Sequence, residues 1–174
     1  IKAKSEEIES CLHMCSHVLE LKGGAYISKS GLFTDAIFSI KPTKMEIQKG
    51  ILIPGHRCIP FTDSDVPSGL TEFFFDGERL PHKTITLSLQ EAHSFFSLYG
   101  EEYAIQYILG DPANSSLEIR YDREFPSNVN LTVTDFSKVY EKCNFGSNDI
   151  FLASVLDWDN SVVGIQPLIS DKNN

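Results

Sequence analysis

Hydrophobic residues near the N-terminus recur with the spacing of a helix. Between residues 5 and 21 they lie three or four positions apart, so that they share one helical face. These positions are Ile8, Leu12, Cys15 and Leu19. Ser5 and the acidic residues after it are typical of a helix start, and Gly23 is typical of a helix end. The pattern predicts a helix over residues 5–21, with Cys11 and Cys15 facing the interior.

Most other hydrophobic residues form short runs or alternate with polar residues, as they do in strands. The expected strands cover residues 25–28, 34–40, 51–53, 71–75, 83–87, 117–121, 129–133, 149–156 and 162–165. Asp76-Gly77 is a strong hairpin signal, and we expect residues 83–87 to form its return strand. The last two runs flank an acidic turn and predict a terminal hairpin.

Polar and helix-breaking residues indicate where the remaining helices and loops begin and end. Ser88-Leu-Gln-Glu91 matches a capping box and predicts a helix that ends at Gly100. Thr134 predicts the cap of a short helix that reaches about Glu141. Residues 41–50 form a connector with about one helical turn, and the Pro- and Gly-rich residues 54–70 predict a long ordered loop.

The order of these elements predicts an α+β class. Helices are interspersed irregularly among clustered strands, without the β-α-β alternation of a doubly wound sheet. We expect a β-rich domain with a mainly antiparallel sheet or a partly closed barrel, an N-terminal helix and one or two further short helices. The 174 residues suit one domain, and a subdivision would fall near residues 110–116. Because the chain begins with Ile1, we expect it to be part of a longer protein.

The net charge of the chain limits the kinds of partner that it is expected to bind. The chain carries 15 basic and 24 acidic residues, for a net charge of −9, which argues against a broad nucleic-acid-binding surface. The acidity is concentrated in residues 101–174, with five basic and twelve acidic residues. This half suits a basic protein partner, whereas a polyanion would have to bind the N-terminal third. No apolar run is long enough to span a membrane.

The four cysteines predict free thiols in a reducing cytoplasm. They are too sparse for a disulfide scaffold and contain no CxxC pair. Two glycosylation sequons, at Asn114 and Asn130, keep a secreted protein open as the alternative. His13 and His17 have the spacing of a chelating pair on a helix, but we expect them to be solvated and to bind no metal.

The loop of residues 54–65 holds the strongest candidates for chemistry. His56 is a candidate general base and Arg57 a candidate anion clamp, while Asp63 and Asp65 are candidate ligands of a hard cation. The alternative is structural. His and Arg side chains donate to unpaired loop carbonyls, and aspartates form turns and caps. We favour the structural role and expect no cofactor.

Trp158 is the candidate partner-binding residue. It lies between Asp157 and Asp159 in the terminal turn, where we expect it to be exposed. Exposed tryptophans often anchor partners. The alternative is that its side chain folds back over the hairpin as a lid.

The chain contains no GxSxG, GxGxxG, P-loop or HExxH motif. The leading hypothesis is therefore a non-enzymatic binding or regulatory module that mediates protein–protein interaction in a larger assembly. The alternative is a metal-assisted hydrolase that uses the loop of residues 54–65. A third hypothesis is a nucleic-acid-associated domain that binds through the N-terminal third. The sequence leaves the oligomeric state open.

Overall fold

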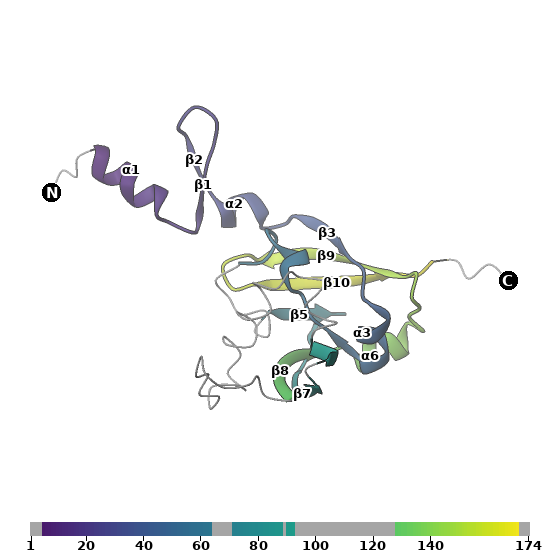
Figure 1. The fold of residues 1–174 in the computed structure, drawn as a ribbon. Coiled ribbons are helices and arrows are strands. Elements are labelled where there is room, and N and C mark those ends of the chain that lie inside the picture. The colour runs from purple at the N-terminus through teal and green to yellow at the C-terminus, as the bar shows by residue number, and fades with distance from the viewer. Residues whose placement is uncertain (1–4, 64–70, 89, 93–127, 171–174) are drawn as a thin grey trace, which may run out of the picture.

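The computed structural model describes residues 5–63, 71–88, 90–92 and 128–170 (Figure 1). Within this part of the chain, strands form a five-stranded, a three-stranded and a two-stranded sheet, and the helices are short. The α+β class is confirmed, with no closed barrel among these strands. The strand expected at residues 117–121, the boundary near 110–116 and most of the helix expected after Ser88 lie outside the described residues.

The five-stranded sheet carries the main core. Its order is β3 (Ile37–Ile40), β9 (Ile150–Asp157), β10 (Val162–Leu168), β5 (Glu72–Phe75) and β6 (Glu78–Arg79). β10 pairs antiparallel with β9 and parallel with β5. The expected terminal hairpin is therefore confirmed, and its second strand forms the middle of the sheet (Figure 1).

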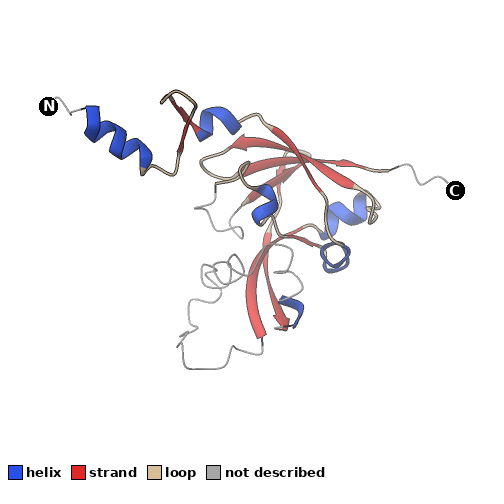
Figure 2. Cartoon of the chain, turned by 45° about the horizontal axis from the view of Figure 1, so that its top comes forward, coloured by secondary structure: helices blue, strands red, loops and turns tan. Residues whose placement is uncertain are grey.

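The three-stranded sheet has the order β4 (Ile51–Leu52), β8 (Asn128–Asp135) and β7 (His82–Ser88). Its longer strands run across the direction of the first sheet (Figure 2). β7 was expected to be the return strand of the Asp76-Gly77 turn, and this was wrong. Both turn residues have positive φ, so the chain reverses at once and β6 is the return strand. β7 pairs with β8 instead.

Short helices connect the strands. They are α2 (Lys29–Phe33), α3 (Lys44–Lys49), the single 3₁₀ turn η1 (His56–Cys58) and α6 (Ser137–Lys142). The capping box expected at Ser88 is confirmed, because Ser88 and Glu91 exchange side-chain-to-backbone hydrogen bonds. The cap expected at Thr134 was wrong. Thr134 lies in β8, and the Asp135 carboxylate accepts the Ser137 N–H at the start of α6.

The N-terminal region differs most from the expectation. The helix α1 (Ser5–His13) is followed by an antiparallel hairpin of β1 (Val18–Glu20) and β2 (Tyr26–Ser28). Leu19 leaves the helical stripe because it pairs with Ile27 in this hairpin. α1 buries no residue and both Cys11 and Cys15 are exposed, so the expected inward-facing cysteine pair was wrong. These elements lie at one end of the molecule, beyond the sheets (Figures 1 and 2).

Strand alternation divides the residues of the five-stranded sheet between two faces. The inner face packs against α6, η1 and the Trp158 turn. Its buried residues are Phe38, Ile40, Phe73, Phe151, Ala153, Val155 and Val163. A second cluster on the three-stranded sheet contains Ile51, Ile53, Leu87, Val129, Leu131 and Val133. On the outer face of the five-stranded sheet, Ile37 and Leu156 are exposed.

Gly50 connects α3 to β4 and generates the first prediction. It adopts a left-handed conformation with φ of 64°, and an added Cβ would overlap Ser137. We expect Gly50→Ala to lower the free energy of unfolding by at least about 2 kcal/mol, measured by urea denaturation. Gly77→Ala is the matched control, because Gly77 has φ of 79° but no atom within 4 Å of the new Cβ. It should cost about 1 kcal/mol, and equal losses would contradict the packing explanation.

Candidate functional site

Arg57 binds a buried carboxylate of its own chain. Its Nη2 lies 2.5 Å from Oε1 of Glu46 and 2.7 Å from the Ile53 carbonyl oxygen, and its Nη1 donates to the Lys41 carbonyl at 2.9 Å. Glu46 is fully buried. The guanidinium therefore has the structural role that the sequence offered as the alternative. An anion clamp at Arg57 stays a prediction, and it would require the side chain to leave Glu46.

The Glu46 carboxylate gathers three segments. Oε2 accepts the Thr43 N–H at 2.7 Å, which completes the capping box of α3, and Oε1 accepts the Ile53 N–H at 2.9 Å. Arg57 adds the charge that makes burial of a carboxylate tolerable. The sequence analysis did not single out Glu46. The Thr43-x-x-Glu46 pattern of a capping box was the signal that would have located it.

Asp63 lies at the meeting point of the loop, the terminal turn and the N-terminal segment. Its side chain is almost fully buried, and its N–H donates to Ser161 Oγ at 3.1 Å. Its carboxylate is 3.9 Å from Nε2 of His17, whose Nδ1 is 3.6 Å from Asp159. His13 and His17 are both exposed, as expected. Their expected place on one helix was wrong, because α1 ends at His13 and His17 approaches two carboxylates beyond it.

The other loop candidates are not brought into this site. Asp65 lies outside the described residues, and of His56 only the backbone, at the start of η1, is described. Convergence of His56, Arg57, Asp63 and Asp65 therefore stays a prediction. Among the residues that the structure describes, no three His, Cys, Asp or Glu side chains are grouped so that they could hold a metal ion.

Trp158 is buried, so its expected exposure was wrong. Only 1% of the residue is accessible. The indole Nε1 donates to the Pro60 carbonyl at 2.8 Å, and the ring stacks on Phe33 at a centroid distance of 6.4 Å. The expected exposure was inferred from the acidic neighbours in the turn, whereas the alternative, a side chain that folds back, agrees with this burial. The inference from the acidic neighbours did not include the loop carbonyl that satisfies the indole N–H in the interior.

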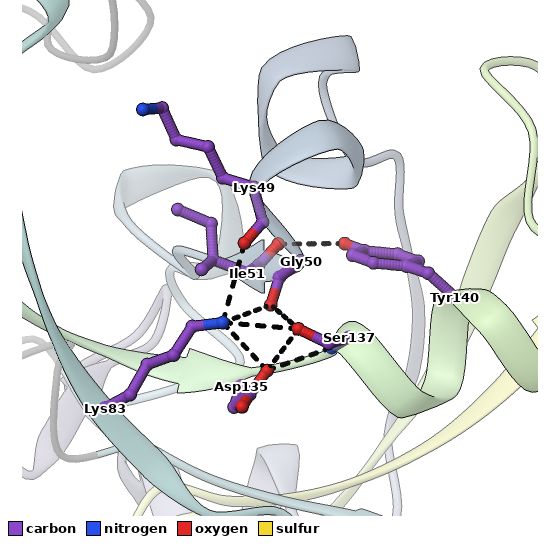
Figure 3. A network of polar contacts seen from close by, with 7 residues as sticks. All are labelled: Lys49, Gly50, Ile51, Lys83, Asp135, Ser137 and Tyr140. Atoms are coloured by element: carbon purple, nitrogen blue, oxygen red, sulfur yellow. Dashed lines mark hydrogen bonds and ion pairs between the residues drawn. The ribbon is translucent and has the colours of Figure 1, made fainter.

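A polar network links the two helix ends at Gly50 (Figure 3). The Lys83 ammonium donates to Asp135 at 2.9 Å, to the Gly50 carbonyl at 3.1 Å and to Ser137 Oγ at 3.3 Å. The Ser137 hydroxyl donates to Asp135 Oδ1 at 2.7 Å. The lysine thus meets the carbonyl-rich C-terminus of α3, and the Asp135 carboxylate accepts the first N–H of α6. No local sequence pattern pointed to this network, because its members lie far apart in the sequence.

The network resembles a serine–lysine pair in composition but not in hydrogen-bond direction. A nucleophilic serine needs a neighbouring base that accepts its proton. Here the Ser137 hydroxyl donates to Asp135 Oδ1 and not to Lys83, while Lys83 Nζ also contacts the Asp135 carboxylate and the Gly50 carbonyl. The arrangement is suited to joining β7, β8 and the two helices.

Burial also lowers the reactivity of two further groups near Glu46. Burial raises the pKa of Cys58 to about 12, despite the opposing effect of Arg57. Burial likewise raises the pKa of Tyr140, whose hydroxyl donates to the Ile51 carbonyl at 3.0 Å. Both groups are neutral near pH 7. Cys58 therefore lacks the thiolate that cysteine nucleophiles need.

Comparisons with known proteins identify no relative. No family model matches the chain, and neither a curated protein nor a solved structure matches it. In the described part of the chain, the helices are too short or too polar to cross a membrane. The function must therefore be inferred from the surfaces and side chains of this chain alone.

The Glu46–Arg57 pair generates the second prediction. Glu46→Gln keeps the size of the side chain but leaves Arg57 without its carboxylate. Removing one partner of a buried ion pair costs about 3 kcal/mol, so we expect a loss of this order by urea denaturation. Asp76→Asn is the control, because it breaks the exposed ion pair of Asp76 with Lys142. It should leave stability unchanged. An unchanged Glu46→Gln variant would show that the pair contributes nothing.

Asp135 generates the third prediction. Burial raises its pKa, but hydrogen bonds from Ser137 and Lys83 outweigh this and hold the pKa below its ordinary value. A lowered folded-state pKa adds stability above the unfolded pKa of about 4, and this stability is lost as the pH falls through the folded pKa. Asp135→Asn should therefore be less stable than the wild type at pH 7, by thermal denaturation. The difference should shrink below about pH 4, and a constant difference would contradict this role.

Proposed function

We propose that this chain is a non-enzymatic binding module that contacts a protein partner through the outer face of the five-stranded sheet. One observation carries the proposal: large apolar side chains are exposed on three neighbouring strands of that face. Ile37 of β3 is 71% exposed, Leu156 of β9 is 51% exposed and Leu168 of β10 is 45% exposed. Large apolar side chains exposed on one face of a sheet are typical of interaction sites.

The register makes part of this surface continuous. Ile37 pairs with Ser154, and Leu156 follows two positions later on the same face. The Leu156 methyl groups lie 3.5 Å and 3.6 Å from the position where a Cβ of Gly164 would be, so this leucine extends over the glycine on β10. Ser154 Oγ lies 3.0 Å from the same position, so Leu156 and Ser154 together cover Gly164 on this face.

The charges around this face favour a basic partner. The exposed Asp35 precedes β3, β9 ends at Asp157, and the turn that follows carries the exposed Asp159. The net charge of −9 has the same sign. An apolar centre with an acidic border is complementary to a partner whose apolar patch is bordered by lysine or arginine.

The same contacts weaken the alternatives. The hydrolase hypothesis needs Arg57 for an anion, but Glu46 occupies it. The nucleic-acid hypothesis needs available basic groups, but several are paired with carboxylates. These pairs are Lys49–Glu91, Arg79–Glu72, Lys83–Asp135 and Lys142–Asp76. A cytoplasmic location is part of the proposal, and the four free cysteines support it.

The fourth prediction tests the outer face. We expect Leu156→Lys to abolish binding of a protein that co-purifies with the wild-type chain, because it places a charge in the apolar patch and repels a basic border. Leu32→Lys is the control, since Leu32 is 45% exposed but lies on α2. Partner and variants would be compared by calorimetry with purified proteins. Equal binding by Leu156→Lys, or catalytic turnover by the isolated chain, would refute the proposal.

A further inference from the structure

We infer that two copies of this chain associate by pairing their β3 strands antiparallel across a twofold axis. This would join the two five-stranded sheets into one continuous sheet. The inference concerns the edge of the sheet, and it does not depend on the partner proposed for the outer face. It rests on the chemistry of the edge, its backbone geometry and the charges at its two ends.

The two edges of the five-stranded sheet differ. At one edge, β6 has two residues, Glu78 and Arg79, both charged and exposed. Short length and charge are features that prevent edge pairing. At the other edge, β3 has four uncharged residues with the sequence Ile-Phe-Ser-Ile. Ile37, at its start, is 71% exposed, so this edge lacks the protective features.

The backbone of β3 is suited to accept another strand. Val155 N–H donates to the Ala36 carbonyl, which sets the alternation of the ladder between β3 and β9. By this alternation Phe38 and Ile40 bond to β9, while Ile37 and Ser39 direct their N–H and C=O groups away from it. The Lys41 carbonyl already accepts a hydrogen bond from Arg57, which limits the pairing edge to the residues before it.

A twofold axis through Phe38 makes the pairing complementary. Ile37 of each copy then lies opposite Ser39 of the other, which allows both residues to exchange N–H···O=C bonds across the axis. The two Ile37 side chains become diagonal neighbours on the same face, within reach of each other. With the axis at Phe38, both outward-facing residues of each strand, Ile37 and Ser39, form hydrogen bonds with the other copy.

The charged residues on either side of β3 favour the same register between the two β3 strands. Asp35 and Lys41 are both exposed, and neither has an ion-pair partner in the part of the chain that the structure describes. Centring the pair on Phe38 brings Asp35 of each copy opposite Lys41 of the other. Two opposite-charge pairs therefore form at the ends of the shared edge. Moving the axis by one residue leaves both charges without this match.

The fifth prediction is that sedimentation velocity of the wild-type chain shows a monomer–dimer equilibrium between low micromolar and near-millimolar concentration, as a short interface implies. Ile37→Lys should raise the dissociation constant at least about tenfold, because a charge on the edge opposes strand addition. Met14→Lys is the control. It adds the same charge to a position that is 78% exposed and lies outside the five-stranded sheet, and it should leave the equilibrium within about twofold of the wild type.

A second pair of variants tests the register. Lys41→Glu places two carboxylates opposite each other and should weaken the dimer. Adding Asp35→Asn, which tolerates the positive φ at that position, should restore part of the affinity. Circular dichroism would confirm that every variant is folded. A wild-type chain that stays monomeric overturns the association, a dimer insensitive to Ile37→Lys overturns the use of β3, and insensitivity to Lys41→Glu overturns the register.

Discussion

The buried ion pair between Glu46 and Arg57 is the interaction on which the centre of the fold depends. One carboxylate caps α3, accepts the Ile53 N–H after β4 and binds the guanidinium from η1. Through Arg57 the same centre reaches the Lys41 carbonyl at the end of β3. A buried charged group needs a hydrogen-bond or ion-pair partner for each of its polar atoms. The segments that supply these partners to Glu46 therefore constrain one another's positions. The loop that looked most like an active site is held in place by this requirement.

The two sheets meet beside this pair, at Gly50. The glycine supplies the left-handed end of α3, and its missing side chain leaves room for Ser137 of α6. Lys83 from β7 donates to the carbonyl end of one helix, and the Asp135 carboxylate from β8 accepts the first N–H of the other. Tyr140 adds a bond from α6 to the Ile51 carbonyl (Figure 3). The polar groups of this junction are therefore satisfied mainly by one another.

The elements predicted correctly from the sequence are those whose patterns involve neighbouring residues. The Asp76-Gly77 turn, the Ser88 capping box and the terminal hairpin each depend on residues close together in the chain. Prediction from the sequence failed where a segment distant in the chain binds the same residues. Leu19 fits a helix by spacing but pairs with Ile27, and Trp158 reaches the carbonyl of Pro60. The same limit hid Glu46 and Lys83, whose partners follow only from the folded chain.

The strand order has a consequence for the growing polypeptide. β10 lies at the centre of the five-stranded sheet, between β9 and β5, although it is the last in sequence of the strands that the structure describes. During synthesis from the N-terminus, β5 and β6 emerge long before the strand that joins them to β9 and β3. The sheet cannot close until residues 162–168 leave the ribosome, so its early strands stay exposed to chaperones and to one another until then. A premature stop shortly before β10 would leave two separated fragments of the sheet instead of trimming one edge.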